Sequence, residues 1–221
     1  MEGLAFFLAG LPLVVVLNHL VIDLTTFDEE LVDDETGRVL PWQIGPWPDR
    51  VRWAVLLLLP AMMAVAGLRF DLLQAIAVSL LVAALLTCTA TDLLRFRVPN
   101  VVTYPGIILA LAAAVLLPDG DVADALLAAA VGGGFFFVLA FITAGGIGLG
   151  DVKLAMLIGA GLGLQIGLQA LFWGILAAAV VMGALLVIGV VSRRQAIPYA
   201  PFLSLAAIVV LLMQGTAFAP L

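Results

Sequence analysis

The sequence predicts an all-α membrane protein, a polytopic bundle of about eight transmembrane helices that forms a single domain over residues 1–221. Of these 221 residues, 65% are hydrophobic and only 11% are charged, whereas roughly a quarter of the residues of ordinary soluble domains are charged. A water-soluble fold cannot bury so much apolar surface, so the lipid bilayer is the expected solvent. Apolar runs of about 20 residues recur along the chain, and this is the length that a helix needs to cross a bilayer.

Short polar breaks separate the expected spans. We expect them at residues 3–24, 51–69, 72–91, 101–117, 122–144, 152–170, 171–191 and 199–216. The first span is preceded by Glu2 rather than by Lys or Arg, which is not the pattern of a secretory signal. Residues 152–191 are almost continuously apolar, so their division rests on Gln165 and Gln169, and a count of seven spans stays open. Pro99 and Pro105 are expected at helix boundaries.

The distribution of Lys and Arg predicts the orientation, because these residues gather on the cytoplasmic side. With both ends of the chain outside, all cations except Arg69 fall inside, namely Arg38, Arg50, Arg52, Arg95, Arg97, Lys153, Arg193 and Arg194. The longest polar segment, residues 25–50, then becomes a cytoplasmic loop. Its acidic residues between Asp28 and Glu35 are expected to be solvated.

Residue counts exclude several kinds of site. Cys88 is the single cysteine and His19 the single histidine, so an internal disulfide and a thiolate zinc site are excluded. No nucleophile motif accompanies His19, which leaves Ser-His and Cys-His catalysis without support. His19 and Asp23 lie four residues apart on one helical face and are expected to satisfy each other. No basic and aromatic surface suited to nucleic acid is present.

Carboxylates at membrane depth are costly and are therefore functional candidates. Asp23, Asp92 and Asp151 lie at or within the ends of expected spans. Asp92 ends the third span and Asp151 opens the sixth, which places both at the cytoplasmic edge. A carboxylate pair suits peptide hydrolysis, because one group acts as a base toward water while the other donates a proton to the carbonyl oxygen.

Two neighbouring carboxylates cannot both ionise cheaply, so such a pair holds one proton. The helix dipole favours an anion at Asp151, which opens a helix, and disfavours one at Asp92, which ends a helix. The nearby cations Arg95 and Arg97, in contrast, favour the anion of Asp92. The position of the shared proton therefore stays open.

Glycines surround Asp151. Gly145, Gly146, Gly148 and Gly150 lack side chains, so a substrate backbone could approach closely. Asp151, Ala155, Gly159, Gly163 and Gly167 follow one another at four-residue spacing, a small-residue pattern of close helix packing, which turns Asp151 toward protein. Lys153 lies two positions further along and points elsewhere; an anchoring role near the lipid headgroups and a role in the site both stay open.

Four segments, in this order along the chain, resemble the type IV prepilin peptidase family. Residues 148–151 (Gly-Leu-Gly-Asp) resemble the GxGD motif of intramembrane aspartyl peptidases, and Val152-Lys153-Leu154 is similar to its extension in prepilin peptidases. Asp92 followed by Val98-Pro99-Asn100 resembles the first aspartate segment of the family. Residues 197–203 resemble the start of its last helix, and residues 7–18 are similar to the first helix of bacterial members.

This resemblance implies an aspartic endopeptidase of the inner (plasma) membrane that cuts prepilin or pseudopilin leaders at the cytoplasmic face, just before the hydrophobic helix of the substrate. Asp92 and Asp151 would be catalytic, and Gly148, Gly150, Lys153, Pro99 and Asn100 would support them. The peptidase would need no cofactor. Many members also carry a cysteine-rich zinc loop after the first helix and methylate the new N-terminus with S-adenosylmethionine. Here the loop at residues 25–50 has no cysteine, so no zinc is expected and methylation is in doubt.

Three other functions remain open from the sequence. A small proton-coupled transporter would also place carboxylates in the membrane, although its site would be expected nearer the midplane. A related intramembrane protease would share the GxGD motif but act on other membrane helices. An inactive peptidase homologue would serve as an assembly scaffold.

Overall fold

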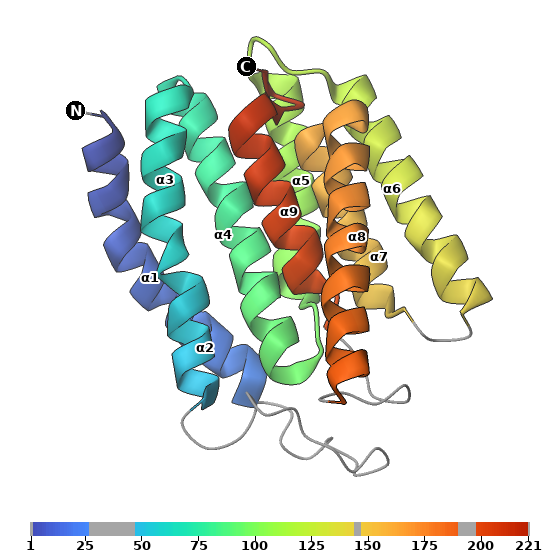
Figure 1. The fold of residues 1–221 in the computed structure, drawn as a ribbon. Coiled ribbons are helices and arrows are strands. Elements are labelled where there is room, and N and C mark those ends of the chain that lie inside the picture. The colour runs from blue at the N-terminus through green and yellow to red at the C-terminus, as the bar shows by residue number, and fades with distance from the viewer. Residues whose placement is uncertain (1, 27–46, 144–146, 190–197, 221) are drawn as a thin grey trace.

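The computed structural model describes residues 2–26, 47–143, 147–189 and 198–220. The described residues do not include Gly145, Gly146 or the acidic segment from Asp28 to Glu35. Figure 1 shows a bundle of roughly parallel and antiparallel helices. They are α1 (Glu2–Thr26), α2 (Trp47–Leu56), α3 (Leu58–Arg69), α4 (Leu72–Arg95), α5 (Asn100–Leu116), α6 (Val122–Ile142), α7 (Leu149–Leu162), α8 (Leu164–Ile188) and α9 (Ala200–Gln214).

The prediction of an all-α polytopic bundle is confirmed. Five helical stretches in the described residues are long and apolar enough to cross a membrane: α1, the combined stretch Asp49–Arg69 of α2 and α3, α4, α6 and α8. The helices α5 and α9 are apolar but shorter. With α2 and α3 taken as one pass, the described helices run through the bundle eight times, as the apolar runs predicted.

The turn between the sixth and seventh passes was placed wrongly. We expected it near residues 170 and 171, but α7 ends at Leu162 and α8 begins at Leu164. Gly163 adopts φ +80° between them, a conformation that glycine reaches at little cost. The Asp124 Oδ2 atom accepts a hydrogen bond of 3.0 Å from the Leu164 N–H. A glycine, rather than Gln165 and Gln169, therefore sets this turn.

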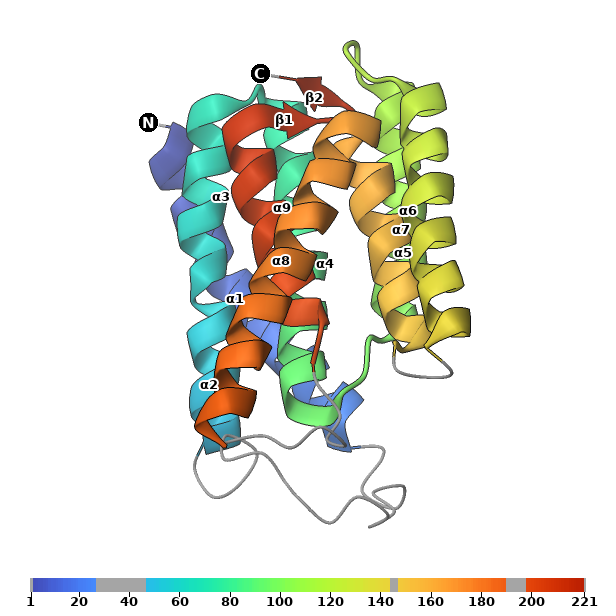
Figure 2. The same ribbon diagram turned by 45° about the vertical axis from the view of Figure 1, so that its right-hand side comes forward.

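The short helix α7 lies inside the bundle. Its 14 residues measure about 21 Å at 1.5 Å per residue, which is less than the roughly 30 Å of a hydrocarbon core. Figure 2 shows α7 between α6 and α8. Gly159 brings α7 against α6 so closely that a Cβ atom there would lie 2.4 Å from the Ala128 carbonyl oxygen. The small-residue spacing thus marks a packing face as far as Gly159, and the helix ends before Gly163.

Two local features were not anticipated. After α9, the short strands β1 (Gly215–Thr216) and β2 (Ala219–Pro220) pair in antiparallel fashion, where the sequence suggested only the end of a helix. Pro105 lies inside α5 rather than at its boundary. It is the sixth residue of α5, so it removes one intrahelical hydrogen bond, the one that its N–H would donate to the Val101 carbonyl oxygen. Pro99, as expected, directly precedes the helix.

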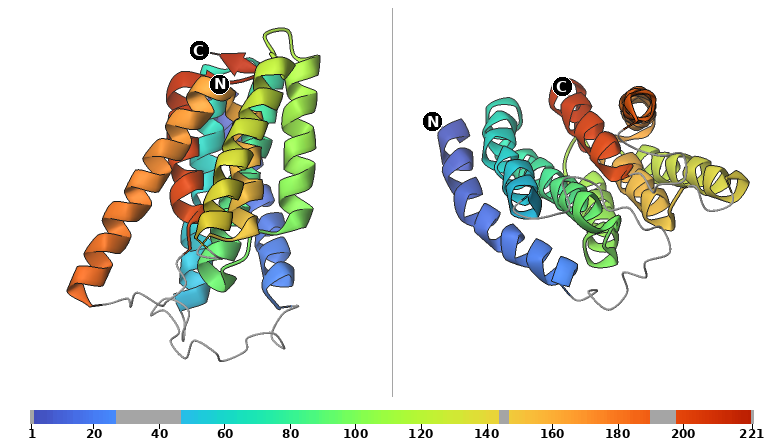
Figure 3. Two further views of the ribbon diagram at one scale, coloured as in Figure 1. Left: turned by 90° about the vertical axis from the view of Figure 1, so that its right-hand side faces the viewer. Right: turned by 60° about the horizontal axis from the view of Figure 1, so that its bottom comes forward.

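The two ends of the chain lie at the same end of the bundle, and the aspartate segments lie at the other. Figures 1 and 3 show the C-terminal end of α4 and the N-terminal ends of α5, α7 and α9 together, opposite the N and C marks. Arg69 lies at the end that holds the chain termini, where it donates a hydrogen bond of 2.7 Å to the Leu212 carbonyl oxygen. The geometry therefore separates Arg69 from Arg97 and Lys153, in agreement with the predicted charge partition.

Candidate active site

Asp92 lies in the last turn of α4 and is buried, with 5% of its surface exposed. Its Oδ2 atom accepts a hydrogen bond of 3.0 Å from the backbone N–H of Ala200, the first residue of α9. The helix ends three residues later at Arg95. The next residue, Phe96, takes a left-handed conformation (φ 53°), and its N–H donates to the Asp92 carbonyl oxygen at 2.8 Å. The Asp92 carboxylate thus lies at the end of α4, bound to the start of α9.

Asp151 is the third residue of α7 and is also buried, with 7% of its surface exposed. Its Oδ2 atom accepts a hydrogen bond of 3.3 Å from the backbone N–H of Gly148, and its own N–H donates to the Gly148 carbonyl oxygen at 3.0 Å. An acidic residue at this position satisfies a free N–H at the start of a helix and interacts favourably with the helix dipole. The predicted orientation of Asp151 toward protein is confirmed.

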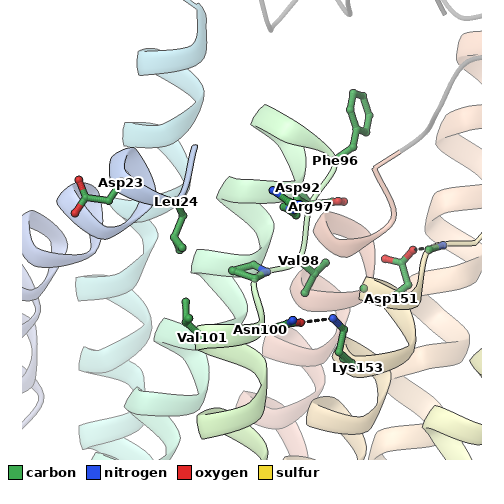
Figure 4. A pocket seen from close by; sticks show the side chains of 13 residues that line it. Asp23, Leu24, Asp92, Phe96, Arg97, Val98, Asn100, Val101, Asp151 and Lys153 are labelled. Carbon is green, nitrogen blue, oxygen red and sulfur yellow. Dashed lines mark hydrogen bonds between the residues drawn. The ribbon is translucent and has the colours of Figure 1, made fainter. Parts of the chain in front are cut away.

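A cavity of about 630 Å³ holds both carboxyl groups at this end of the bundle. Its lining consists of Asp23, Leu24, Asp92, Phe96, Arg97, Val98, Pro99, Asn100, Val101, Gly148, Gly150, Asp151 and Lys153. Figure 4 shows Asp92 on α4 and Asp151 on α7 on neighbouring parts of its wall. The structure thus brings together all seven residues that the sequence singled out as catalytic or supporting.

The helix dipoles at the two aspartates are more alike than the sequence suggested. Asp92 ends α4, which disfavours its anion, but its carboxylate also receives an N–H from the first residue of α9. The first N–H groups of a helix have no partner within the helix and carry its positive partial charge. Each carboxylate is therefore held by the N-terminal end of a helix, α7 for Asp151 and α9 for Asp92.

The segment after Asp92 supports the cavity from the α5 side. The Pro99 carbonyl oxygen accepts hydrogen bonds from the N–H groups of Val102 at 3.2 Å and Thr103 at 3.1 Å, which fixes the start of α5. The Lys153 Nζ atom donates to the Asn100 Oδ1 atom and lies 5.7 Å from the centre of the Tyr104 ring. Lys153 therefore ties the start of α7 to the start of α5 and lines the site.

Gly150 also has a packing role that the sequence did not indicate. A Cβ atom at Gly150 would lie 3.1 Å from the Val98 Cβ atom, which is closer than ordinary van der Waals contact. The missing side chain thus lets α7 approach the 96–99 segment. At Gly148, by contrast, the nearest atom to a Cβ would be the Asp151 Oδ2 atom at 3.5 Å, an ordinary contact.

Two contributors were missed by the sequence reasoning. Ala200 supplies its backbone N–H to Asp92, and Val98 fills the space above Gly150. The resemblance of residues 197–203 to a family segment was the available signal for Ala200, but an alanine side chain indicates no chemistry. Asp23 also lies on the cavity wall, at its α1 side.

The residues present do not fit a thiolate zinc site. Cys88 is fully buried within α4, as expected of a small apolar residue. In residues 2–26, 47–143, 147–189 and 198–220, the structure contains no group of three or more His, Cys, Asp or Glu side chains that could hold a metal ion.

Comparison with known proteins assigns the family. Residues 79–188 match the model of the type IV leader peptidase family. The chain belongs to this family. The matched segment runs from α4 to the end of α8, so it contains both Asp92 and Asp151 but neither α1 nor α9. The Ala200 contact to Asp92 thus comes from outside the part of the chain that carries the family match.

One curated relative is a "Prepilin leader peptidase/N-methyltransferase" of Bacillus subtilis (strain 168). It is 32% identical over 146 residues, which are 66% of this chain and 59% of the relative. The match therefore covers about three fifths of the length of this relative. No solved structure matches the chain.

Proposed function

We propose that this protein is a membrane aspartic endopeptidase that removes the leader of type IV prepilin-like or pseudopilin precursors at the cytoplasmic face of the membrane. The observation that carries the proposal is the shared cavity of Asp92 and Asp151, each carboxylate held by a backbone N–H at the start of a helix. The family match and the name of the Bacillus subtilis relative supply the substrate class.

The chemistry needs one carboxylate and one carboxylic acid. The carboxylate takes a proton from a water molecule as the water oxygen attacks the carbonyl carbon of the scissile peptide. The acid donates its proton to the carbonyl oxygen, which gives a tetrahedral diol. The C–N bond then breaks, and the leaving amine takes up a proton from one carboxyl group. One hydroxyl of the diol gives its proton to the other carboxylate, which restores one acid and one carboxylate. Burial of Asp92 and Asp151 suits this cycle, because neighbouring buried carboxylates share one proton more readily than they both ionise.

The cavity lies at one end of the bundle, which favours an enzyme over a transporter with a site at the membrane midplane. Arg97 and Lys153 line it, and the start of the Asp49–Arg69 stretch, with Arg50 and Arg52, lies at the same end. Because cations gather on the cytoplasmic side, this end is the proposed cytoplasmic face.

The proposed peptidase uses no cofactor. S-adenosylmethionine would be needed only for methyl transfer to the new N-terminus, which the proposal does not include. The partners are the precursor protein and the bilayer, with no role for nucleic acid.

Co-expression with a type IV prepilin tests the proposal. The wild-type protein should convert the precursor to a shorter form, seen as a gel shift, and mass spectrometry should find the cut immediately before the hydrophobic helix. Asp92→Asn and Asp151→Asn should each abolish conversion, because asparagine keeps the shape but can serve neither as base nor as acid. A loss of about 10²- to 10⁴-fold is expected for a group in direct proton transfer.

Asp119→Asn is the matched control. Asp119 lies before α6 at the opposite end of the bundle, where its Oδ2 atom accepts a hydrogen bond of 3.0 Å from the Gln74 Nε2 atom. The asparagine oxygen can still accept this bond, so processing should be unchanged. Full processing by either Asp92→Asn or Asp151→Asn would refute the two-aspartate mechanism, and an inactive wild type would refute leader cleavage.

A further inference from the structure

The catalytic cavity extends to the side of the bundle between α1 and α5. Leu24 near the end of α1 and Val101 near the start of α5 both line it. Figure 4 shows these two side chains in the part of the cavity away from Asp151. In the left panel of Figure 3, α1 and α5 lie on the same side of the bundle. Val101 is exposed, so this part of the cavity wall lies at the outer surface of the bundle.

A separate apolar hollow lies next to the cavity along α5. It has a volume of about 450 Å³ and lies between α4 and α5, with Leu80, Ala84, Val102, Pro105 and Leu109 among its lining residues. The cavity ends on α5 at Val101, and the hollow begins at Val102. Consecutive residues of one helix therefore line the catalytic cavity and then the apolar hollow.

A second apolar hollow, of about 320 Å³, lies on the other side of the same face of α4. It is lined by α1 residues, including Phe6 and Leu13, by α4 residues and by Met63 of α3. Ile76 and Leu80 of α4 line both hollows. The two hollows thus form one trough, with the outer face of α4 as its floor and α1 and α5 as its walls. We call this feature the α4 trough.

The dimensions and lining of the α4 trough fit one apolar helix. From Val102 to Leu116, its α5 wall measures about 21 Å at 1.5 Å per residue, which is about two thirds of a hydrocarbon core. The hollow between α4 and α5 is lined almost entirely by aliphatic side chains, with Phe218 at the far end. An occupant without polar groups, about 14 residues long in contact with this wall, satisfies these conditions.

We propose that the α4 trough docks the transmembrane helix of the precursor, immediately C-terminal to the bond that Asp92 and Asp151 cleave. The inference rests on the proposed function and adds where the substrate lies. The N-terminal end of a substrate helix in the trough would then lie at the cavity, between Leu24 and Val101. The chain that precedes this helix then passes the two aspartates, so the seated helix positions the scissile bond.

Photocrosslinking tests the location. The probe is p-benzoylphenylalanine in place of Leu80 or Leu109 in the trough, and in place of Phe137 on α6 or Phe172 on α8 as controls. All four side chains are exposed on the outside of the bundle. With Asp151→Asn to retain the precursor in membranes that contain a type IV prepilin, the two trough positions should form adducts with the prepilin helix, and the control positions should not.

A kinetic comparison tests whether the trough contributes to binding. Ala112 lines the trough and is partly buried, whereas Ala130 is exposed on α6 away from it. Ala112→Trp should raise the KM for a full-length prepilin about tenfold, a loss of about 1.4 kcal/mol in binding, with kcat little changed. Ala130→Trp should leave both constants unchanged. A peptide that spans the cleavage site but lacks the helix should be cleaved equally by wild type and Ala112→Trp.

The outcomes separate this inference from the proposed function. A wild type that cleaves prepilin, with trough adducts absent or formed only with lipid or with a second copy of the chain, would overturn the docking site and leave the peptidase intact. Equal KM values for wild type and Ala112→Trp would do the same. A wild type that cleaves no prepilin would overturn the peptidase, and the docking site with it.

Discussion

The Asp92 carboxylate accepts a hydrogen bond of 3.0 Å from the backbone N–H of Ala200, 108 residues further along the chain. This contact joins the last turn of α4 to the first residue of α9. It orients the Asp92 carboxyl group and places it at the N-terminal end of α9, which carries a positive partial charge. Asp151 receives the equivalent support from Gly148 at the start of its own helix.

Removal of this N–H should impair catalysis. Replacing Ala200 by lactic acid changes the amide to an ester, which removes the N–H donor and keeps the side chain; it also weakens the Tyr199 carbonyl as an acceptor. Hydrogen bonds to charged groups contribute about 1.5–3 kcal/mol, so kcat should fall about 10- to 100-fold. The measurement is the rate of prepilin cleavage by purified protein in detergent.

The control is the corresponding ester at Phe202. Its N–H also lies in the first turn of α9, but it donates to the Tyr199 carbonyl oxygen at 3.1 Å and does not contact an aspartate. This variant should keep nearly full activity. Equal loss in both variants would mean that the start of α9 matters for folding rather than for the aspartate.

The sequence could predict Asp92 but not its donor, and the reason is physical. An ionisable side chain at membrane depth is conspicuous because it is costly. A backbone N–H belongs to every residue except proline, so nothing marks the one at Ala200 until the fold places α9 beside α4. The segment 197–203 was recognised by its resemblance to a family motif, and its contact with Asp92 required the structure.

The two glycines before Asp151 should differ in their tolerance of a side chain. Gly150→Ala places a Cβ atom 3.1 Å from the Val98 Cβ atom, so the start of α7 must shift away from the 96–99 segment and move Asp151. Cleavage should fall at least about tenfold, because misplacement by a fraction of an ångström weakens catalysis.

Gly148→Ala is the matched variant. Its nearest neighbour would be 3.5 Å away, and its φ of −74° is open to any residue. This protein should remain within about threefold of wild type, a difference below 1 kcal/mol. The reverse order of activities would contradict the packing role assigned to Gly150.

The segmentation of residues 152–191 shows where hydropathy stops being informative. Bilayer-facing and core-facing helices are equally apolar, so the short buried α7 and the long α8 read as one stretch. We placed the turn near Gln165 and Gln169 because their side chains are polar, but both are exposed on α8. The turn is set by the conformation of Gly163 and by Asp124, which lies 40 residues earlier in the chain.

Lys153 and Asn100 should act as a pair. Lys153→Met removes the charge and keeps the stem, and Asn100→Ala removes the acceptor. Each should lower cleavage, and the double variant should be little worse than either single variant. Because Asn100 is exposed, the coupling energy should be small, about 0.5–1 kcal/mol. Additive losses in a double-mutant cycle would show that the hydrogen bond between them does not position α7.

The packing of α7 against α6 should tolerate no side chain at Gly159. A Cβ atom there would lie 2.4 Å from the Ala128 carbonyl oxygen, which is backbone and cannot turn aside. Gly159→Ala should therefore lower the free energy of unfolding by about 1–3 kcal/mol, seen as a fall in the midpoint of thermal unfolding in detergent.

Gly134→Ala on α6 is the control for this last variant, because a Cβ atom there would meet nothing within 4 Å. Alanine is up to about 1 kcal/mol more favourable than glycine inside a helix, so this protein should be as stable as wild type or slightly more stable. Since Asp151 lies in the first turn of α7, Gly159→Ala should also reduce cleavage at temperatures where the protein is still folded. A Gly159→Ala protein with unchanged stability and activity would show that α7 is not held by this contact.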